Sequence, residues 1–105
     1  MYDLKWTDSE KKLARRVFDE ALESALARTL SDFKARAAAA ETPSAMWVVG
    51  DYLHRSRRDI DETFNYRYSK LPLVFAMLIR KGHLDMARLS GLSEEKLEVI
   101  RRLLS

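Results

Sequence analysis

The sequence predicts an all-α fold. Only three glycines and two prolines occur in 105 residues, so the chain offers few places at which a helix must stop. Alanine, leucine, arginine, lysine and glutamate, which favour helices, dominate, whereas β-branched residues are sparse. We expect one domain over residues 1–105, with a stalk of two long antiparallel helices at 7–66 and a small helical head at 69–105.

The first helix is predicted to begin after Thr7 and to run to about residue 40. Thr7 and Glu10 match a capping box, in which each side chain accepts a hydrogen bond from the other residue's N–H. No glycine or proline follows until Pro43. At about 1.5 Å per residue this helix is on the order of 50 Å long, which exceeds the width of so small a domain. It must therefore protrude or be covered by another chain.

The apolar residues of this helix form two stripes on different sides of its axis. The first stripe consists of Ala14, Phe18, Ala21 and Ala25. The second consists of Leu22, Leu26, Leu30, Phe33 and Ala37. Two stripes predict two packing partners, and we expect the second partner to be another copy of the chain in a homodimer.

The second helix is predicted to begin at Pro43, with Thr42 as its N-cap. Because the connection is so short, the two helices are expected to form an antiparallel hairpin. Residues spaced alternately by four and three positions predict a coiled-coil seam along this helix. These are Met46, Gly50, Leu53, Arg57, Ile60 and Phe64.

Arg57 and Gly50 are the unusual members of this seam. If the seam is buried, Arg57 needs a carboxylate, either Asp61 one turn away or Asp51 of a second, antiparallel copy. This predicts an interface of Trp47, Asp51 and Arg57; the alternative is a solvated helix face with Arg57 extended outward. Gly50 costs about 1 kcal/mol in mid-helix relative to alanine, which indicates either close approach of another helix or a tolerated neutral glycine.

The C-terminal part is predicted to contain three short helical segments. Leu71–Ile79 is an apolar helix capped by Ser69, with Pro72 in its first turn and Gly82 at its end. A turn of helix is expected at 84–89, and a last helix after Ser93.

The residues that carry chemistry are few. Without cysteine, the chain has no disulfide and no thiolate ligand, and His54 and His83 lie too far apart in sequence to suggest a zinc site. The acids near Asp61 stand among arginines and are read as ion pairs. Neither a glycine-rich phosphate loop nor a nucleophile elbow occurs, so the sequence predicts no enzyme, no metal and no cofactor.

Charge and hydropathy limit the partners. The net charge of +3 is too small for a dedicated nucleic-acid binder, although residues 55–81 hold seven basic residues against three acidic ones and would suit an acidic protein or, as a minor alternative, nucleic acid. The Met1–Trp6 segment lacks the apolar run of a signal peptide, and the longest apolar run has nine residues, where a membrane span needs about 20. We expect a cytoplasmic protein without membrane contact.

The run from Trp47 to Asp61 resembles the central helix of the fluorescence recovery protein family, in which Trp, Asp-aromatic-Leu, Arg and Ile-Asp recur at this spacing. The similarity continues at residues 74–76, Leu78 and Gly82, and backward to Leu30, Phe18 and Trp6. It implies an antiparallel all-helical dimer. It also implies a regulator that binds the photoactivated orange carotenoid protein and speeds its return to the orange state, which ends energy quenching at the phycobilisome.

By position, Trp47, Asp51 and Arg57 match the family's functional patch at the dimer interface, and Leu30 matches an interface leucine. Two positions depart from the family pattern. Gly50 stands where photoprotective members have histidine, and Leu73 stands where the head carries an aromatic residue. Similar sequences occur in bacteria without phycobilisomes, so the resemblance leaves open a divergent homologue with another protein partner.

Overall fold

The computed structural model describes residues 4–105 and, within this range, contains four α-helices, one 3-10 helix and no strand. The elements are α1 (Asp8–Ala39), α2 (Pro43–Thr63), α3 (Leu71–Arg80), η1 (Met86–Leu89) and α4 (Glu94–Leu104). The all-α prediction is confirmed. Residues 1–3, part of the segment assessed for a signal peptide, lie outside the described residues. Across residues 4–105, no helix combines the length and the apolar character that crossing a bilayer requires.

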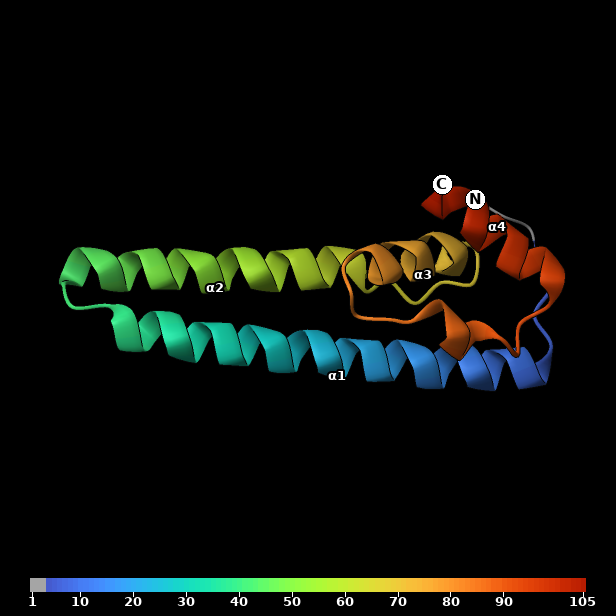
Figure 1. Ribbon diagram of the computed structural model, residues 1–105, viewed down its shortest axis with the longest axis horizontal. Helices are drawn as coiled ribbons and strands as arrows, with labels where there is room; N and C mark the ends of the chain where they lie inside the picture. Colours follow the sequence, from blue (N-terminus) through green and yellow to red (C-terminus); the bar gives the residue numbers. More distant parts are fainter. Residues whose placement is uncertain (1–3) are drawn as a thin grey trace.

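Helices α1 and α2 lie side by side and antiparallel along the longest dimension of the molecule, which measures 53 Å (Figure 1). Both predicted starts are confirmed. The Thr7 hydroxyl accepts a 3.1 Å hydrogen bond from the Glu10 N–H, and Glu10 Oε1 accepts one of 3.0 Å from the Thr7 N–H. Thr42 caps α2 by accepting from the Ala45 N–H at 3.1 Å, with Pro43 in the first turn. These local bonds fix where each long helix begins.

The hydrophobic core lies at one end of the molecule, where α3, η1 and α4 pack around the first half of α1 (Figure 1). We call this end the base and define it as residues 4–25 and 64–105. The first apolar stripe of α1 is buried here, as its pattern predicted. The largest fully buried side chains of the base are Phe75, Leu71, Leu78, Leu89, Ile100, Val17 and Pro72. The core thus joins α1 to the C-terminal helices.

A buried ion pair closes the base between the starts of α1 and α4. Lys96 Nζ lies 3.1 Å from Glu10 Oε1 and also donates to the Lys5 carbonyl at 2.6 Å. The Ser93 N–H donates to Glu10 Oε2 at 2.8 Å. Burial alone would raise the pKa of Glu10, but the backbone N–H groups of Thr7 and Ser93, together with Lys96, lower it to about 2. Glu10 is therefore held as a carboxylate that ties the two ends of the chain together.

The rest of the hairpin, residues 26–63, forms the arm. Its α2 side chains that are half-buried recur every three or four residues: Ala45, Val49, Tyr52, Ser56 and Ile60. Tyr52 contacts α1 directly, because its ring lies 4.0 Å from the Arg36 guanidinium and its hydroxyl 3.4 Å from Asp32 Oδ2. Of the predicted seam, only Ile60 belongs to this half-buried face, and Phe64 follows the end of α2. Met46, Gly50, Leu53 and Arg57 are exposed on the neighbouring face.

The predicted cap of α3 also needs correction. Lys70, not Ser69, is the N-cap residue, and it makes no side-chain capping bond. A cap at Ser69 would place Pro72 three residues later, where it has no N–H to donate. Instead, the Arg67 carbonyl accepts from the N–H groups of Lys70 and Leu71. The other predicted boundaries hold, since Gly82 follows α3 with a φ of +80° and Ser93 caps α4.

Candidate protein-interaction site

Exposed apolar side chains gather on the arm. Of the large hydrophobic residues exposed in the described part of the chain, only Tyr68 lies in the base. The others are Leu26 and Leu30 of α1 and Met46, Trp47, Val48 and Leu53 of α2. Contiguous exposed apolar surface on a helical protein marks a site of protein contact. Leu26 and Leu30 of the second stripe of α1 are thus left exposed in this chain, whereas Leu22 and Phe33 are half-buried.

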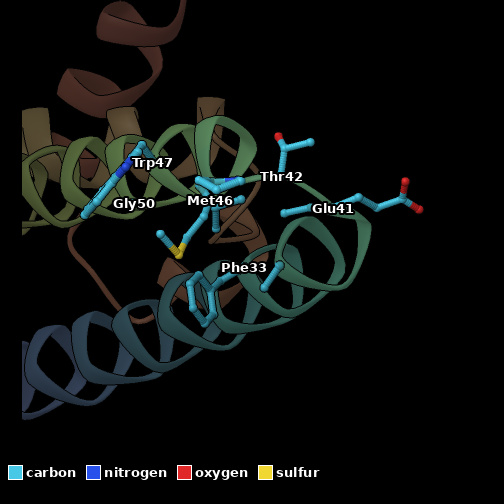
Figure 2. A pocket seen from close by; sticks show the side chains of 10 residues that line it. Phe33, Glu41, Thr42, Met46, Trp47 and Gly50 are labelled. Atoms are coloured by element: carbon cyan, nitrogen blue, oxygen red, sulfur yellow. The ribbon is translucent and has the colours of Figure 1, made fainter.

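An open groove of about 640 Å³ lies between the two helices near the tip of the arm. Phe33 of α1 and Met46 of α2 point toward one another across it (Figure 2). Trp47 and Gly50 also line it, so two of the predicted site residues share one apolar surface. The groove offers side-chain packing at an open surface rather than an enclosed pocket.

Trp47 is the most exposed of these apolar residues, with 70% of its surface accessible. Asp51 is also exposed and follows one helical turn later, so both side chains lie on the same face of α2. Tryptophan is enriched at the centres of protein interfaces, where it contributes a large share of the binding energy. Trp47 and Asp51 therefore combine an apolar anchor with an adjacent negative charge.

Arg57 lies on another side of α2. Its position is about 120° from Asp51 around the helix, and the structure does not bring the two side chains together. Arg57 Nε lies 4.0 Å from Asp61 Oδ2, and the two side chains are 84% and 71% exposed. Within this chain, therefore, Arg57 is not buried and needs no carboxylate to compensate its charge. An exposed pair of this kind contributes little to stability.

Gly50 has no close neighbour within this chain. A Cβ atom built on it would meet nothing within 4 Å. The close approach of another helix predicted at Gly50 is absent between α1 and α2, because the glycine is on the exposed side of α2. Only a contact from outside the chain can make use of its missing side chain.

Leu73 is separated from the other predicted site residues. It is half-buried in α3, whereas the groove is lined by residues around the connection between α1 and α2. This connection lies at the end of the hairpin far from α3 (Figure 1). Leu30, on α1, is 53% exposed and belongs to the apolar surface of the arm. The predicted residues therefore form one set on the arm and a single residue in the base.

Two features of the arm escaped the sequence analysis. Val48 is exposed beside Trp47, although it does not belong to the seam predicted on this helix. Tyr52 is held between Asp32 and Arg36 of α1. The i,i+4 spacing of Asp32 and Arg36 was a usable signal, because two polar groups on one helix face can hold an aromatic side chain of the next helix.

Among residues 4–105, no group of three His, Cys, Asp or Glu side chains is placed to hold a metal ion.

Comparison with known proteins gives consistent matches over nearly the whole chain. The family described as photoprotection regulator fluorescence recovery protein matches residues 6–104. The fluorescence recovery protein of Synechocystis sp. (strain PCC 6803) is 28% identical over 98 residues, covering 93% of this chain and 90% of that protein.

Solved structures agree with this match. The Fremyella diplosiphon fluorescence recovery protein is similar with a TM-score of 0.90 at 32% identity, covering 94% of this chain and 97% of that one. The Synechocystis structure gives the same TM-score and the same coverage at 27% identity.

Proposed function

This chain belongs to the fluorescence recovery protein family, and from that membership we propose that it is a non-enzymatic, dimeric regulator of photoprotection. Its partner is the photoactivated orange carotenoid protein, whose return to the orange dark state it accelerates. The observation that carries this proposal is the family match over residues 6–104 together with a shared fold at a TM-score of 0.90.

Acceleration of this kind needs only binding. A protein that relaxes between two states passes through strained intermediate conformations. A regulator that binds these conformations more tightly than either end state lowers the barrier to relaxation. No acid, base or metal has to take part. We assign the binding to the surface of α3 near Leu73 and to the patch of Trp47, Asp51 and Arg57 on the arm, which in a dimer also takes part in the contact between the two copies.

The exposed surface of the arm supports the homodimer. We propose that a second, antiparallel copy covers Leu30, Leu53 and the groove, with residues 7–66 as a stalk and 69–105 as a head of a single domain. A stable dimer buries about 1,200–2,000 Å² in total, and the exposed apolar side chains of the arm are the surface that it would bury. In this arrangement Arg57 would leave solvent and meet Asp51 of the second copy, which supplies the carboxylate that a buried arginine needs.

The direct test mixes the protein with photoactivated orange carotenoid protein in the dark and follows the red-to-orange recovery. We expect faster recovery at stoichiometric excess of the wild type. Trp47→Ala should lose most of this acceleration, whereas Lys12→Ala, an exposed change in the base, should keep it. A wild type without any effect would reject the photoprotective role.

Gly50 and Leu73 favour a second candidate function. Both differ from the residues that photoprotective members carry at these positions, so a divergent homologue with a different protein partner is the alternative. In that case the wild type would dimerise and yet leave the recovery rate unchanged. Tight DNA binding with a steep salt dependence would instead indicate the minor alternative, a nucleic-acid binder.

A further inference from the structure

The end of α3 meets both helices of the hairpin at a polar junction. A cavity of about 350 Å³ lies there, between α1, α2 and the turn that follows α3. Its polar lining includes Arg28, Thr29, Ser56, Asp59, Lys81 and His83. His83 is one of only two histidines in the chain. Neither the fold nor the proposed function accounts for it.

Lys81 connects the three elements at this junction. Its ammonium group donates to both carboxylate oxygens of Asp59 at 2.9 and 3.0 Å and to the Thr63 hydroxyl at 3.0 Å. Its carbonyl accepts a 3.3 Å hydrogen bond from Arg28 Nη1. One residue at the end of α3 therefore ties that helix to α2 through its side chain and to α1 through its backbone.

The position of the His83 ring is set by the way α3 ends. Gly82, with a φ of +80°, donates its N–H to the Ile79 carbonyl at 3.1 Å, and the His83 N–H donates to the Leu78 carbonyl at 2.9 Å. This pair of bonds is a Schellman motif, which holds the following residue against the helix. The ring lies 6.5 Å from the ring of Phe64, and its Nδ1 is buried without a hydrogen-bond partner among the described residues.

The charges near His83 come from every element around it. The groups that share its two flanking cavities are Arg28, Asp32, Asp59, Lys81 and Asp85. Burial, together with the positive charges of Arg28 and Lys81, lowers the pKa of His83 below its ordinary value of 6.5, against the opposing effect of Asp59. Asp59 is already paired with Lys81, so a protonated ring would add a third positive charge beside two cations.

We propose that His83 acts as a pH-sensitive latch between the base and the arm. At neutral pH its uncharged ring allows the Lys81 and Arg28 contacts to close the junction. In mild acid its protonation repels these two cations and releases the end of α3 from the hairpin. Because the folded-state pKa is lowered, the latch is fully closed above about pH 6.5 and opens as the pH falls below that value. This device is independent of the proposed partner.

The second histidine provides an internal control. His54 lies on the exposed face of α2, with its Nε2 3.4 Å from Arg58 Nη2. Proton NMR between about pH 8 and pH 5 can follow both imidazole rings in one sample of the wild-type protein. We expect the His83 ring to titrate below the ordinary histidine value of 6.5. A midpoint for His83 at or above this value would overturn the proposal.

Amide hydrogen exchange measures the opening itself. Between about pH 7.5 and pH 5, the protection factors of the Gly82 and His83 amides, corrected for intrinsic exchange rates, should fall about tenfold in the wild type. His83→Gln should abolish this fall, whereas His54→Gln should retain it. A fall that persists in His83→Gln would contradict the latch. If that variant does not fold, the wild-type titration and exchange data decide the question by whether protection is lost at the pH where His83 takes up its proton.

Discussion

The base and the arm share the helix α1, but large apolar side chains are mostly buried in the base and mostly exposed in the arm. In the base, Phe75 and Leu78 are completely buried among residues of α1, α3 and α4. In the arm, Trp47 and Leu30 expose more than half of their surface to solvent. The exposed end is the surface that we propose a second molecule covers. The contrast separates the part that holds the core from the part that we propose binds.

The same contrast appears in the ion pairs. Glu10 and Lys96 in the base are almost fully buried and share their hydrogen bonds with backbone groups. Arg57 and Asp61 on the arm are separated by 4.0 Å and remain mostly in solvent. The first pair is required for the stability of the fold, because removal of one partner would leave a buried charge unpaired. The second remains available to exchange its partner on binding.

The largest effect is expected from truncation of the core. Phe75→Ala should lower the free energy of unfolding by about 3–5 kcal/mol, because it removes a large, fully buried ring. Trp47→Ala should change it by less than about 0.5 kcal/mol at low protein concentration, because the indole is already in solvent. Urea unfolding followed by circular dichroism measures both. Equal losses would show that the arm is stabilised within the single chain after all.

A charge introduced on the arm tests whether its exposed apolar surface forms the proposed dimer. Leu30→Glu should weaken self-association by roughly 100-fold or more, because it removes buried apolar area and places a carboxylate in the interface. The helical content of the chain should not change. Light scattering at tens of micromolar should then report a monomer for Leu30→Glu and a dimer for the wild type. A wild type that is monomeric at this concentration would remove the basis of the dimer.

Local signals in the sequence predicted much of the fold. Thr7, Thr42 and Ser93 cap helices because a hydroxyl at each position meets an N–H a few residues later, a relation that depends only on spacing. Gly82 ends α3 for a similarly local reason, its positive φ. Ser69 failed as a cap because Pro72 lacks the N–H that the capping bond requires.

Features that depend on distant contacts were harder to predict. On α2 the face toward α1 carries Val49, Tyr52 and Ser56 and lies beside the predicted seam, and residue spacing along one helix does not show which of two adjacent faces meets the other helix of the chain. Lys96 was overlooked, although it is one turn before the buried Ile100 and therefore on the apolar side of α4. Its partner Glu10 is 86 residues away, and only the folded chain brings the two together.

Strong acid should weaken the base through Glu10. The pKa of Glu10 is lowered from 4.5 to about 2, so its contribution to stability is present above about pH 4.5 and is lost as the pH falls toward 2. We expect a loss of up to about 3 kcal/mol over this range. Glu10→Gln keeps a side chain suited to the capping box and should flatten the profile, whereas Asp61→Asn, which changes the exposed pair, should not. Thermal unfolding at a series of pH values measures the difference, and identical profiles for both variants would assign the acid sensitivity to other carboxylates.

The smallest change expected, Gly50→Ala, distinguishes the isolated arm from the assembled one. In the single chain an added Cβ meets open space, so alanine should raise the free energy of unfolding by about 0.5–1 kcal/mol through its better helix propensity. If a second helix crosses α2 at Gly50, the same methyl group separates the two backbones and weakens the dimer. In that case Gly50→Ala should raise the free energy of unfolding measured at low protein concentration and lower the dimer affinity measured by sedimentation at high concentration. A variant that gains stability and dimerises as tightly as the wild type would make Gly50 a neutral glycine, and the dimer contact would have to be sought elsewhere on the arm.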